Sequence, residues 1–242
     1  MIKFLSKFFI ITISVFALLV MYISYFGIET KKFDNLIKKK SNEFNKKIKI
    51  EFENTKIYLK PFELNLAIKL QNPRILIEYN TIKLSKLDIF LSIKSFFNSN
   101  FSLKKVEVAF VENDIKDLTK ITNIFLPMII NKEINKIFVK GKLYGEFIIP
   151  FDSNGRLAKG YGFSGKVIDA SLNFKKEFNI KNLTAEIKHS KKYKANLFNI
   201  KVQKGSTYGF DLSGSNIDLI RENKEIKISS LLATRGEFNI IH

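Results

Sequence analysis

Side chains suited to acid–base or metal chemistry are sparse in this sequence. It holds two histidines, His189 and His242, and no cysteine. We interpret His189-Ser190-Lys191-Lys192 as a polar turn, and neither histidine has a partner at metal-ligand spacing. The lack of cysteine excludes disulfides and thiolate metal sites. We therefore expect no metal site and no cofactor.

Motifs for nucleotide binding and nucleophilic catalysis are also missing. Gly141-Lys142-Leu143-Tyr144-Gly145 lacks the spacing of a phosphate-binding loop, and no Gly-x-Ser-x-Gly turn occurs. Asp114 and Asp117 suit the cap and first turn of a short helix over 114–125, before Pro127. Most other acidic residues fall on the polar positions of alternating segments. We expect no catalytic residues and no enzymatic activity.

The formal charge is +18, from 41 Lys and Arg against 23 Asp and Glu. Such a charge raises nucleic acid or an anionic membrane surface as a partner. The excess is mostly lysine and is spread along the chain, without an arginine-rich stripe or a zinc-finger spacing. We therefore expect no nucleic-acid partner.

The N-terminus predicts a membrane anchor over residues 1–28. Lys3 and Lys7 precede an uncharged run from Phe8 to Ile28, and its 21 residues span roughly the 30 Å hydrocarbon core. The alternative is a cleaved signal peptide, which has a shorter apolar region and small residues at its exit. Here the exit is bulky (Met21-Tyr22-Ile23-Ser24-Tyr25-Phe26), so we expect an uncleaved anchor.

The flanking charges give two signals for orientation. Lys3 and Lys7 favour an N-terminus inside the cytoplasm, whereas Lys31, Lys32, Lys38, Lys39 and Lys40 favour the reverse. Because long downstream domains are translocated largely regardless of flanking charge, we expect the C-terminal part to be exported.

Residues 29–46 predict an amphipathic juxtamembrane helix. Phe33, Leu36, Ile37 and Phe44 recur at helical spacing between lysines, and Thr30 suits the N-cap. Two roles stay open for this helix. It could contact anionic headgroups, or it could pack on the first strands.

Residues 47–242 predict a β-rich domain, because apolar and polar residues alternate along most of it. The longest unbroken run is Phe62 to Leu70, which we predict to be one strand ended by Pro73. Asp152-Ser153-Asn154-Gly155 indicates a tight turn. Strands with one polar face indicate an antiparallel sheet whose apolar face must be covered.

Two architectures satisfy this pattern. One is a mainly β, curved, mostly antiparallel sheet that follows the transmembrane helix, carries two short helices and leaves an open apolar groove. The other is a closed β-sandwich, in which the sheet covers itself. Periodicity does not distinguish them.

The order of these parts resembles the start of an AsmA-like protein, from the bridge-like lipid transfer group built of repeating β-groove units. The resemblance covers most of the chain and rests on pattern. It is carried by Tyr25-Phe26-Gly27-Ile28, the helix Phe33 to Phe44, Ile48-Lys49-Ile50-Glu51-Phe52, Ile57-Tyr58-Leu59-Lys60-Pro61-Phe62, Leu103-Lys104-Lys105-Val106-Glu107-Val108, the helix near Leu118, and Ser164-Gly165-Lys166-Val167-Ile168-Asp169-Ala170.

The resemblance implies a single-pass anchor in the inner (cytoplasmic) membrane, a periplasmic domain, and phospholipid movement that supports outer-membrane biogenesis. A dozen strands stacked about 4.8 Å apart give a groove of roughly 60 Å, too short to cross a periplasm. The apolar end at Ile240-Ile241 then favours a domain truncated at its C-terminus.

The sequence thus predicts phospholipids as partners, bound by their acyl chains, with other envelope proteins as further partners. The alternative is a structural or assembly factor that binds proteins through a strand edge. The candidate groove residues are Phe62, Leu64, Leu66, Ile68, Leu70, Leu84, Ile89, Leu91, Val139, Leu143 and Phe147.

Overall fold

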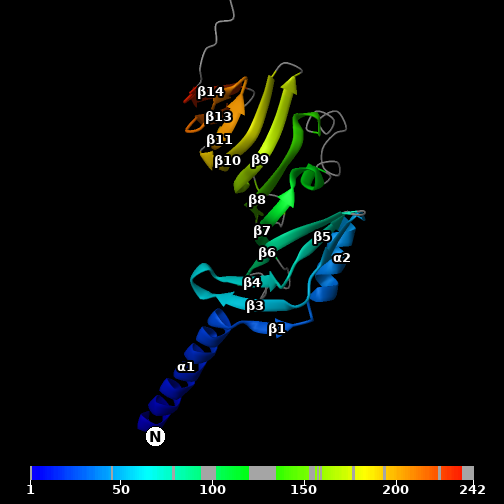
Figure 1. Cartoon of the computed structure of the whole chain (residues 1–242). Coiled ribbons are helices and arrows are strands. Elements are labelled where there is room, and N and C mark those ends of the chain that lie inside the picture. The colour runs from blue at the N-terminus through cyan, green and yellow to red at the C-terminus, as the bar shows by residue number, and fades with distance from the viewer. Residues whose placement is uncertain are drawn as a thin grey trace, which may run out of the picture.

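The computed structural model is mainly β, with one curved antiparallel sheet that follows an apolar N-terminal helix (Figure 1). It describes residues 2–44, 46–77, 80–93, 102–119, 135–152, 156, 158, 160–175, 178–192, 195–222 and 225–235. The predicted fold class is confirmed. The predicted turn at 153–155, the helix beyond residue 119 and the apolar end at 240–241 lie outside the described residues.

The helices are α1 (Ile2–Tyr25), α2 (Asp34–Phe44) and the 3-10 turn η1 (Pro61–Glu63), with a further helical turn over 115–119. The strands are β1 (Ile28–Thr30), β2 (Ile48–Glu51), β3 (Thr55–Lys60), β4 (Asn65–Leu70), β5 (Arg74–Ile77), β6 (Asn80–Ser92), β7 (Leu103–Asp114), β8 (Phe138–Pro150), β9 (Gly162–Lys175), β10 (Phe178–Lys192), β11 (Ala195–Thr207), β12 (Phe210–Asp211), β13 (Asn216–Glu222) and β14 (Glu225–Leu231).

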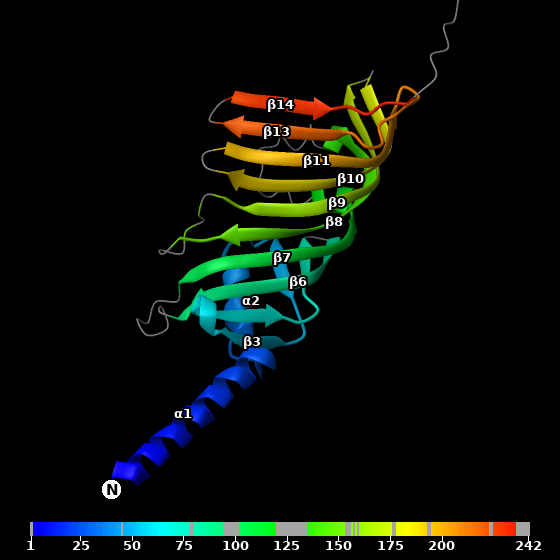
Figure 2. The same cartoon turned by 90° about the vertical axis from the view of Figure 1, so that its left-hand side faces the viewer.

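The strands stack in nearly sequential order away from α1. The hydrogen-bonded path is β1-β3-β4-β6-β7-β8-β9-β10-β11-β13-β14, and Figure 2 shows β3 to β14 as successive rungs above the helix. Short β12 pairs with β11, while β2 and β5 branch from the first half of β6. Because each neighbour is antiparallel and close in sequence, side chains of one parity share one face across the stack.

The junction between α1 and the sheet is short. β1 follows α1 within three residues and pairs with β3, where Ile28 lies opposite Ile57. Gly27 makes the turn at φ +71°, and a Cβ there would lie 2.9 Å from the Tyr58 ring. The membrane-length helix therefore leads directly into the first edge of the sheet.

The helix α2 begins four residues after the expected N-cap, because Thr30 belongs to β1 instead. Its Ile37 is buried beside Ile48 of β2, so α2 packs on the first strands. Two roles were left open for this segment, and the structure shows one of them: α2 packs on the first strands.

The upper strands bend sharply along a line of irregularities. Register shifts fall between Lys140 and Lys142 in the β8–β9 pair, and between Leu183 and Ala185 in the β9–β10 pair. Positive φ angles occur nearby at Gly141, Asp169 and Asn182. Bulges of this kind increase twist and bend a strand, and Figure 2 shows these strands turning near one end.

Candidate functional site

One face of the sheet, hereafter the inner face, carries apolar residues in continuous cross-strand rows. The longest row links eight neighbouring strands from β6 to β14. Its members are Leu87, Val108, Phe147, Phe163, His189, Phe198, Leu219 and Ile228. The row is apolar except at His189.

A second row begins on β1, next to α1. Ile28 of β1 lies opposite Ile57, and the row continues through four further strands. Those further members are Ile68, Ile89, Val106 and Ile149. The inner face is therefore apolar from the strand next to α1 to the far end of the stack.

The end of the inner face near α1 is closed. α2, β2 and β5 fold over it, and Ile37, Ile48, Ile77 and Ile82 pack against Ile68, Leu70, Leu84 and Leu87. All eight are buried. This part is an ordinary two-layer core, so its residues stabilise the fold.

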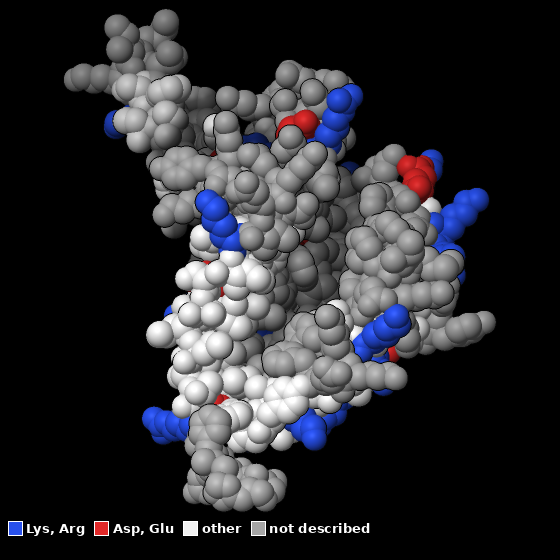
Figure 3. All heavy atoms as spheres, turned by 90° about the horizontal axis from the view of Figure 1, so that it is seen from above, with Lys and Arg blue, Asp and Glu red and all other residues white. Residues whose placement is uncertain are grey.

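Beyond β7 the inner face is less covered. Phe147, Phe163, Ile187, Ile200 and Leu219 are half-buried, and Ile228 keeps 68% of its surface exposed. Figure 3, viewed from above Figure 1, shows an area of uncharged residues with lysine and arginine side chains at its edges. An incompletely buried apolar wall of this extent is typical of a binding surface.

A second buried cluster lies at the bend of the upper strands. Val167, Ala170, Leu172, Leu183, Ala185 and Val202 come from β9, β10 and β11, and Ile115 packs on them from the helical turn after β7. This cluster holds the bend, which gives the sheet its curved section.

Aromatic rings line the middle of the inner face. Phe147 contacts Phe110 at 5.6 Å and Phe163 at 4.5 Å between ring centroids, and Phe198 contacts His189 at 4.4 Å. Gly145 and Gly165 face each other beside these rings. A Cβ on Gly165 would lie 2.6 Å from the Phe163 ring, so the glycine pair lets that ring lie flat on the wall.

His189 is the polar exception in the aromatic strip. It is 4% exposed, Tyr161 stacks on it at 4.3 Å, and neither ring nitrogen has a hydrogen-bond partner among the residues that the structure describes. A buried polar atom without a partner costs about 1–3 kcal/mol. The residue lies within β10 and in the wall, so its interpretation as a polar turn is wrong.

The opposite, outer face is polar and held by ion pairs. Lys86 contacts Glu107 and Glu146 at 2.5 and 3.1 Å, and Lys105 contacts Glu107 at 2.9 Å. Burial of the Glu107 carboxyl favours a higher pKa, but its hydrogen bonds from Lys86 and Lys105 outweigh burial and hold that pKa below its usual value. Burial raises the pKa of the neighbouring Asp88 carboxyl, although Lys69 and Lys86 act against the increase.

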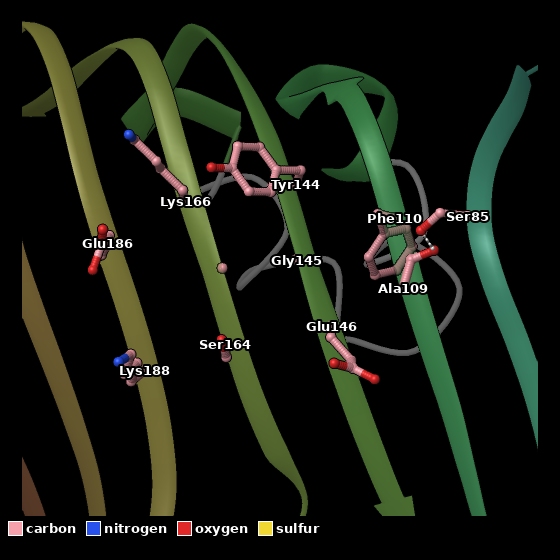
Figure 4. Close-up of a pocket in the computed structure, with 11 residues that line it drawn as sticks. Ser85, Ala109, Phe110, Tyr144, Gly145, Glu146, Ser164, Lys166, Glu186 and Lys188 are labelled. Carbon is pink, nitrogen blue, oxygen red and sulfur yellow. Dashed lines mark hydrogen bonds between the residues drawn. The ribbon is translucent and has the colours of Figure 1, made fainter.

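A shallow depression of about 410 Å³ lies on the outer side of β6 to β10 (Figure 4). Tyr144, Glu146, Lys166, Glu186 and Lys188 rim it with charges of both signs. Lys166 and Glu186 are register partners on neighbouring strands. This alternation of charge is typical of a solvated sheet face, and we assign no ligand to the depression.

The helix α1 contains a span, Ser6–Tyr25, that is long and apolar enough to cross a membrane. The side chains of this span are not buried by the rest of the chain. Tyr22, Tyr25 and Phe26 form an exposed aromatic group at its end, where the rings meet at 5.2 and 5.0 Å. Such rings suit a membrane–water interface.

The structure brings most of the predicted groove residues onto the inner face. Leu66 pairs with Leu91 and Ile68 with Ile89, while Leu143 and Phe147 continue the face on β8. Ile68, Leu70 and Leu84 belong to the closed core near α1. The partly exposed members Leu66, Ile89, Leu91, Leu143 and Phe147 stay candidates for lining a ligand site.

Three predicted groove residues lie elsewhere. Phe62 is in η1 and fully exposed, and Leu64 has a left-handed φ of 51°, so the strand predicted from residue 62 begins at Asn65. Val139 is 39% exposed, while its neighbour Phe138 packs on the buried cluster. The register shift after Lys140 reverses the parity that linked Val139 to Leu143.

Sequence reasoning missed Phe163, His189 and Phe198 as inner-face residues. One available signal was parity, since Leu183, Ala185, Ile187 and His189 alternate along one segment. Extending that alternation by one step would have placed His189 in the wall.

Among the described residues, no three His, Asp or Glu side chains lie close enough to hold a metal ion. Comparison with protein-family models, with curated proteins and with solved structures finds no match for this chain.

Proposed function

We propose that this chain is a membrane-anchored envelope protein of AsmA-like type, which binds phospholipid acyl chains on its inner face and supports lipid transport or outer-membrane biogenesis. It acts by binding and not by catalysis. The observation that carries the proposal is the continuity of the apolar inner face, from Ile28 beside α1 to Ile228 on β14.

The chemistry of the wall suits a hydrocarbon chain. Acyl chains have no hydrogen-bonding groups, so they require only continuous apolar contact. Each buried methylene contributes about 0.8 kcal/mol, and ten would contribute roughly 8 kcal/mol before the entropic cost of ordering the chain. The half-buried residues Phe163, Ile187 and Ile200 offer such contact on the neighbouring strands β9, β10 and β11.

The proposed location follows from α1 and its charges. α1 spans the inner membrane with Lys3 and Lys7 on the cytoplasmic side, and the sheet lies in the periplasm. The eleven strands of the main path, stacked about 4.8 Å apart, give a height of roughly 50 Å. This height is less than the width of a periplasm, and we propose other envelope proteins as further partners.

A second candidate function is envelope assembly through protein contacts. It is favoured by β14, the last strand of the main path, where Ile228 and Leu231 are 68% and 74% exposed. Within the described residues β14 pairs along its length with β13 alone, and an edge strand of this kind can accept a strand from a partner.

Site-specific photo-crosslinking of the full chain in its membrane tests the lipid proposal. A photoreactive amino acid at Ile200, on the inner face, should form adducts with the mass of lipid. The matched control is the same amino acid at Lys201, which is exposed and on the other face. Equal lipid labelling at both positions, or protein adducts alone at Ile200, would contradict the proposal.

A further inference from the structure

We propose that His189 binds the acidic headgroup of a lipid whose acyl chains lie on the inner face. The inference rests on the proposed function and names the class of lipid: an amphiphile with a phosphate or carboxylate oxygen close to its acyl chains.

The first argument is the unmet hydrogen bonding of the imidazole. His189 is 4% exposed, and neither Nδ1 nor Nε2 has a partner in the described part of the chain. A neutral imidazole has one N–H donor and one acceptor nitrogen, so a buried one normally has two partners. Among the described residues, the rings of Phe198 and Tyr161 contact it.

The second argument is the place of His189 along its strand. Leu183, Ala185 and Ile187 precede it at alternate positions, and they form the apolar wall. The next register row of the same parity is Lys191, opposite Asn196, which lies opposite Arg221. His189 is therefore the last residue of the alternating segment before Lys191 and Lys192, with which β10 ends.

That order matches the order of groups in an acidic lipid. Acyl chains on Ile187 and Ile200 would place the headgroup near His189, close to the register positions of the cationic residues 191 and 221. The imidazole N–H donates to an anionic oxygen, and the cations favour net negative charge. A headgroup that carries its own ammonium group lacks this charge complementarity.

Tyr161 controls access to the imidazole. Its ring stacks on His189 at an interplanar angle of 22°, yet the residue is 47% exposed. Tyr161 lies immediately before β9, where it is not held within a strand. Rotation of this side chain away from His189 would expose the imidazole on the inner face without disturbing the sheet.

The test uses the full chain in detergent micelles, labelled with ¹⁵N-histidine. The sequence holds two histidines, so His242 is an internal reference. The protein is exposed to phosphatidylcholine vesicles that contain phosphatidic acid, oleate or neither, and is then recovered. We expect the His189 nitrogen shifts to move with one acidic lipid or both, which separates phosphate from carboxylate, and His242 to stay unchanged.

The second readout is the composition of bound lipid. Wild-type protein should enrich the acidic lipid about tenfold over the vesicle, the factor expected for one charge-assisted hydrogen bond. His189→Leu should bind similar total lipid without this enrichment. The matched control His189→Gln should retain part of it, because glutamine keeps a donor and an acceptor.

The outcomes are distinct. If His189→Leu keeps the enrichment, or if the His189 shifts ignore acidic lipid, the headgroup assignment is overturned, and ordered water is then the partner of the imidazole. If phosphatidylcholine binds as well as the acidic lipids, the assignment also fails while acyl-chain binding stands. If no lipid binds at all, the proposed function and this inference fall together.

Discussion

At the scale of single residues, the pair Gly145 and Gly165 determines the shape of the inner wall. A Cβ on Gly165 would lie 2.6 Å from the Phe163 ring and 2.7 Å from the Tyr144 carbonyl oxygen. The carbonyl belongs to the backbone, so only the ring can move. Glycine here is therefore a requirement of packing.

We predict that Gly165→Val destabilises the domain by about 1–3 kcal/mol, the usual cost of overpacking, and forces the Phe163 ring away from the wall. The control is Gly162→Ala on the same strand, where the nearest atom to a new Cβ is 3.8 Å away. Thermal unfolding followed by circular dichroism measures both variants. Equal melting temperatures for the two would contradict this account of the wall.

Glu107 provides a residue-scale prediction with a defined pH dependence. Its pKa is below the usual 4.5, so the ionised carboxylate stabilises the folded state above that pH. The contribution is lost as the pH falls through the lowered pKa. Glu107→Gln should cost roughly 1–2 kcal/mol at pH 7, allowing for the partial exposure of Lys86.

The difference in stability between wild type and Glu107→Gln should therefore shrink as the pH falls below about 4.5. Urea unfolding at a series of pH values measures it. Glu112→Gln is the control, because the Glu112–Lys142 pair is about half exposed on both sides and screened by solvent. A pH-independent gap between wild type and Glu107→Gln would refute the role of this carboxylate.

At the scale of elements, α2 covers the inner face of the sheet at the end near α1. Ile37→Ala should destabilise the domain by about 2–4 kcal/mol, since Ile37 is 7% exposed within the core formed with β2, β4, β5 and β6. Lys39→Ala on the same helix should change stability by less than about 0.5 kcal/mol, because its side chain is 77% exposed.

Denaturant unfolding of the full chain compares the two variants. If Ile37→Ala is as stable as Lys39→Ala, α2 does not pack on the strands in solution. Enhanced lipid binding by a stable Ile37→Ala variant would instead show that the covered end of the face can also accept acyl chains.

Most elements were predictable from the period of the apolar residues, and the errors have local physical causes. The alternation from Phe62 to Leu70 is unbroken, yet Pro61 starts a 3-10 turn and Leu64 takes a left-handed conformation, so the strand is shorter. The reversal at Val139 follows the register shift beside Gly141. Both errors arise because a local backbone irregularity shifts parity without altering the pattern of residue types.

At the scale of the whole molecule, one-sided strands and a membrane-length helix were predictable, but the choice between an open sheet and a closed sandwich was not. That choice depends on where the sheet bends. The bend coincides with positive φ angles at Asp169 and Asn182, and neither residue type demands that conformation. The sequence therefore predicted most of the residues that share a face, but not how far that face closes on itself.

The proposed orientation of the molecule can be measured with single cysteines, because the sequence contains none. We predict that a cysteine placed at Lys188, exposed on the outer face of β10, reacts with a membrane-impermeant maleimide in intact spheroplasts. A cysteine placed at Lys3, before the spanning segment, should react only after the membrane is permeabilised. Long translocated domains tolerate positive flanks, so Lys31 and Lys32 do not prevent this orientation.

Reaction at Lys3 but not at Lys188 in intact spheroplasts would place the sheet in the cytoplasm. The inner face would then have no route to the outer membrane, and lipid transport across the envelope would be refuted, although acyl-chain binding would remain open to the crosslinking test at Ile200.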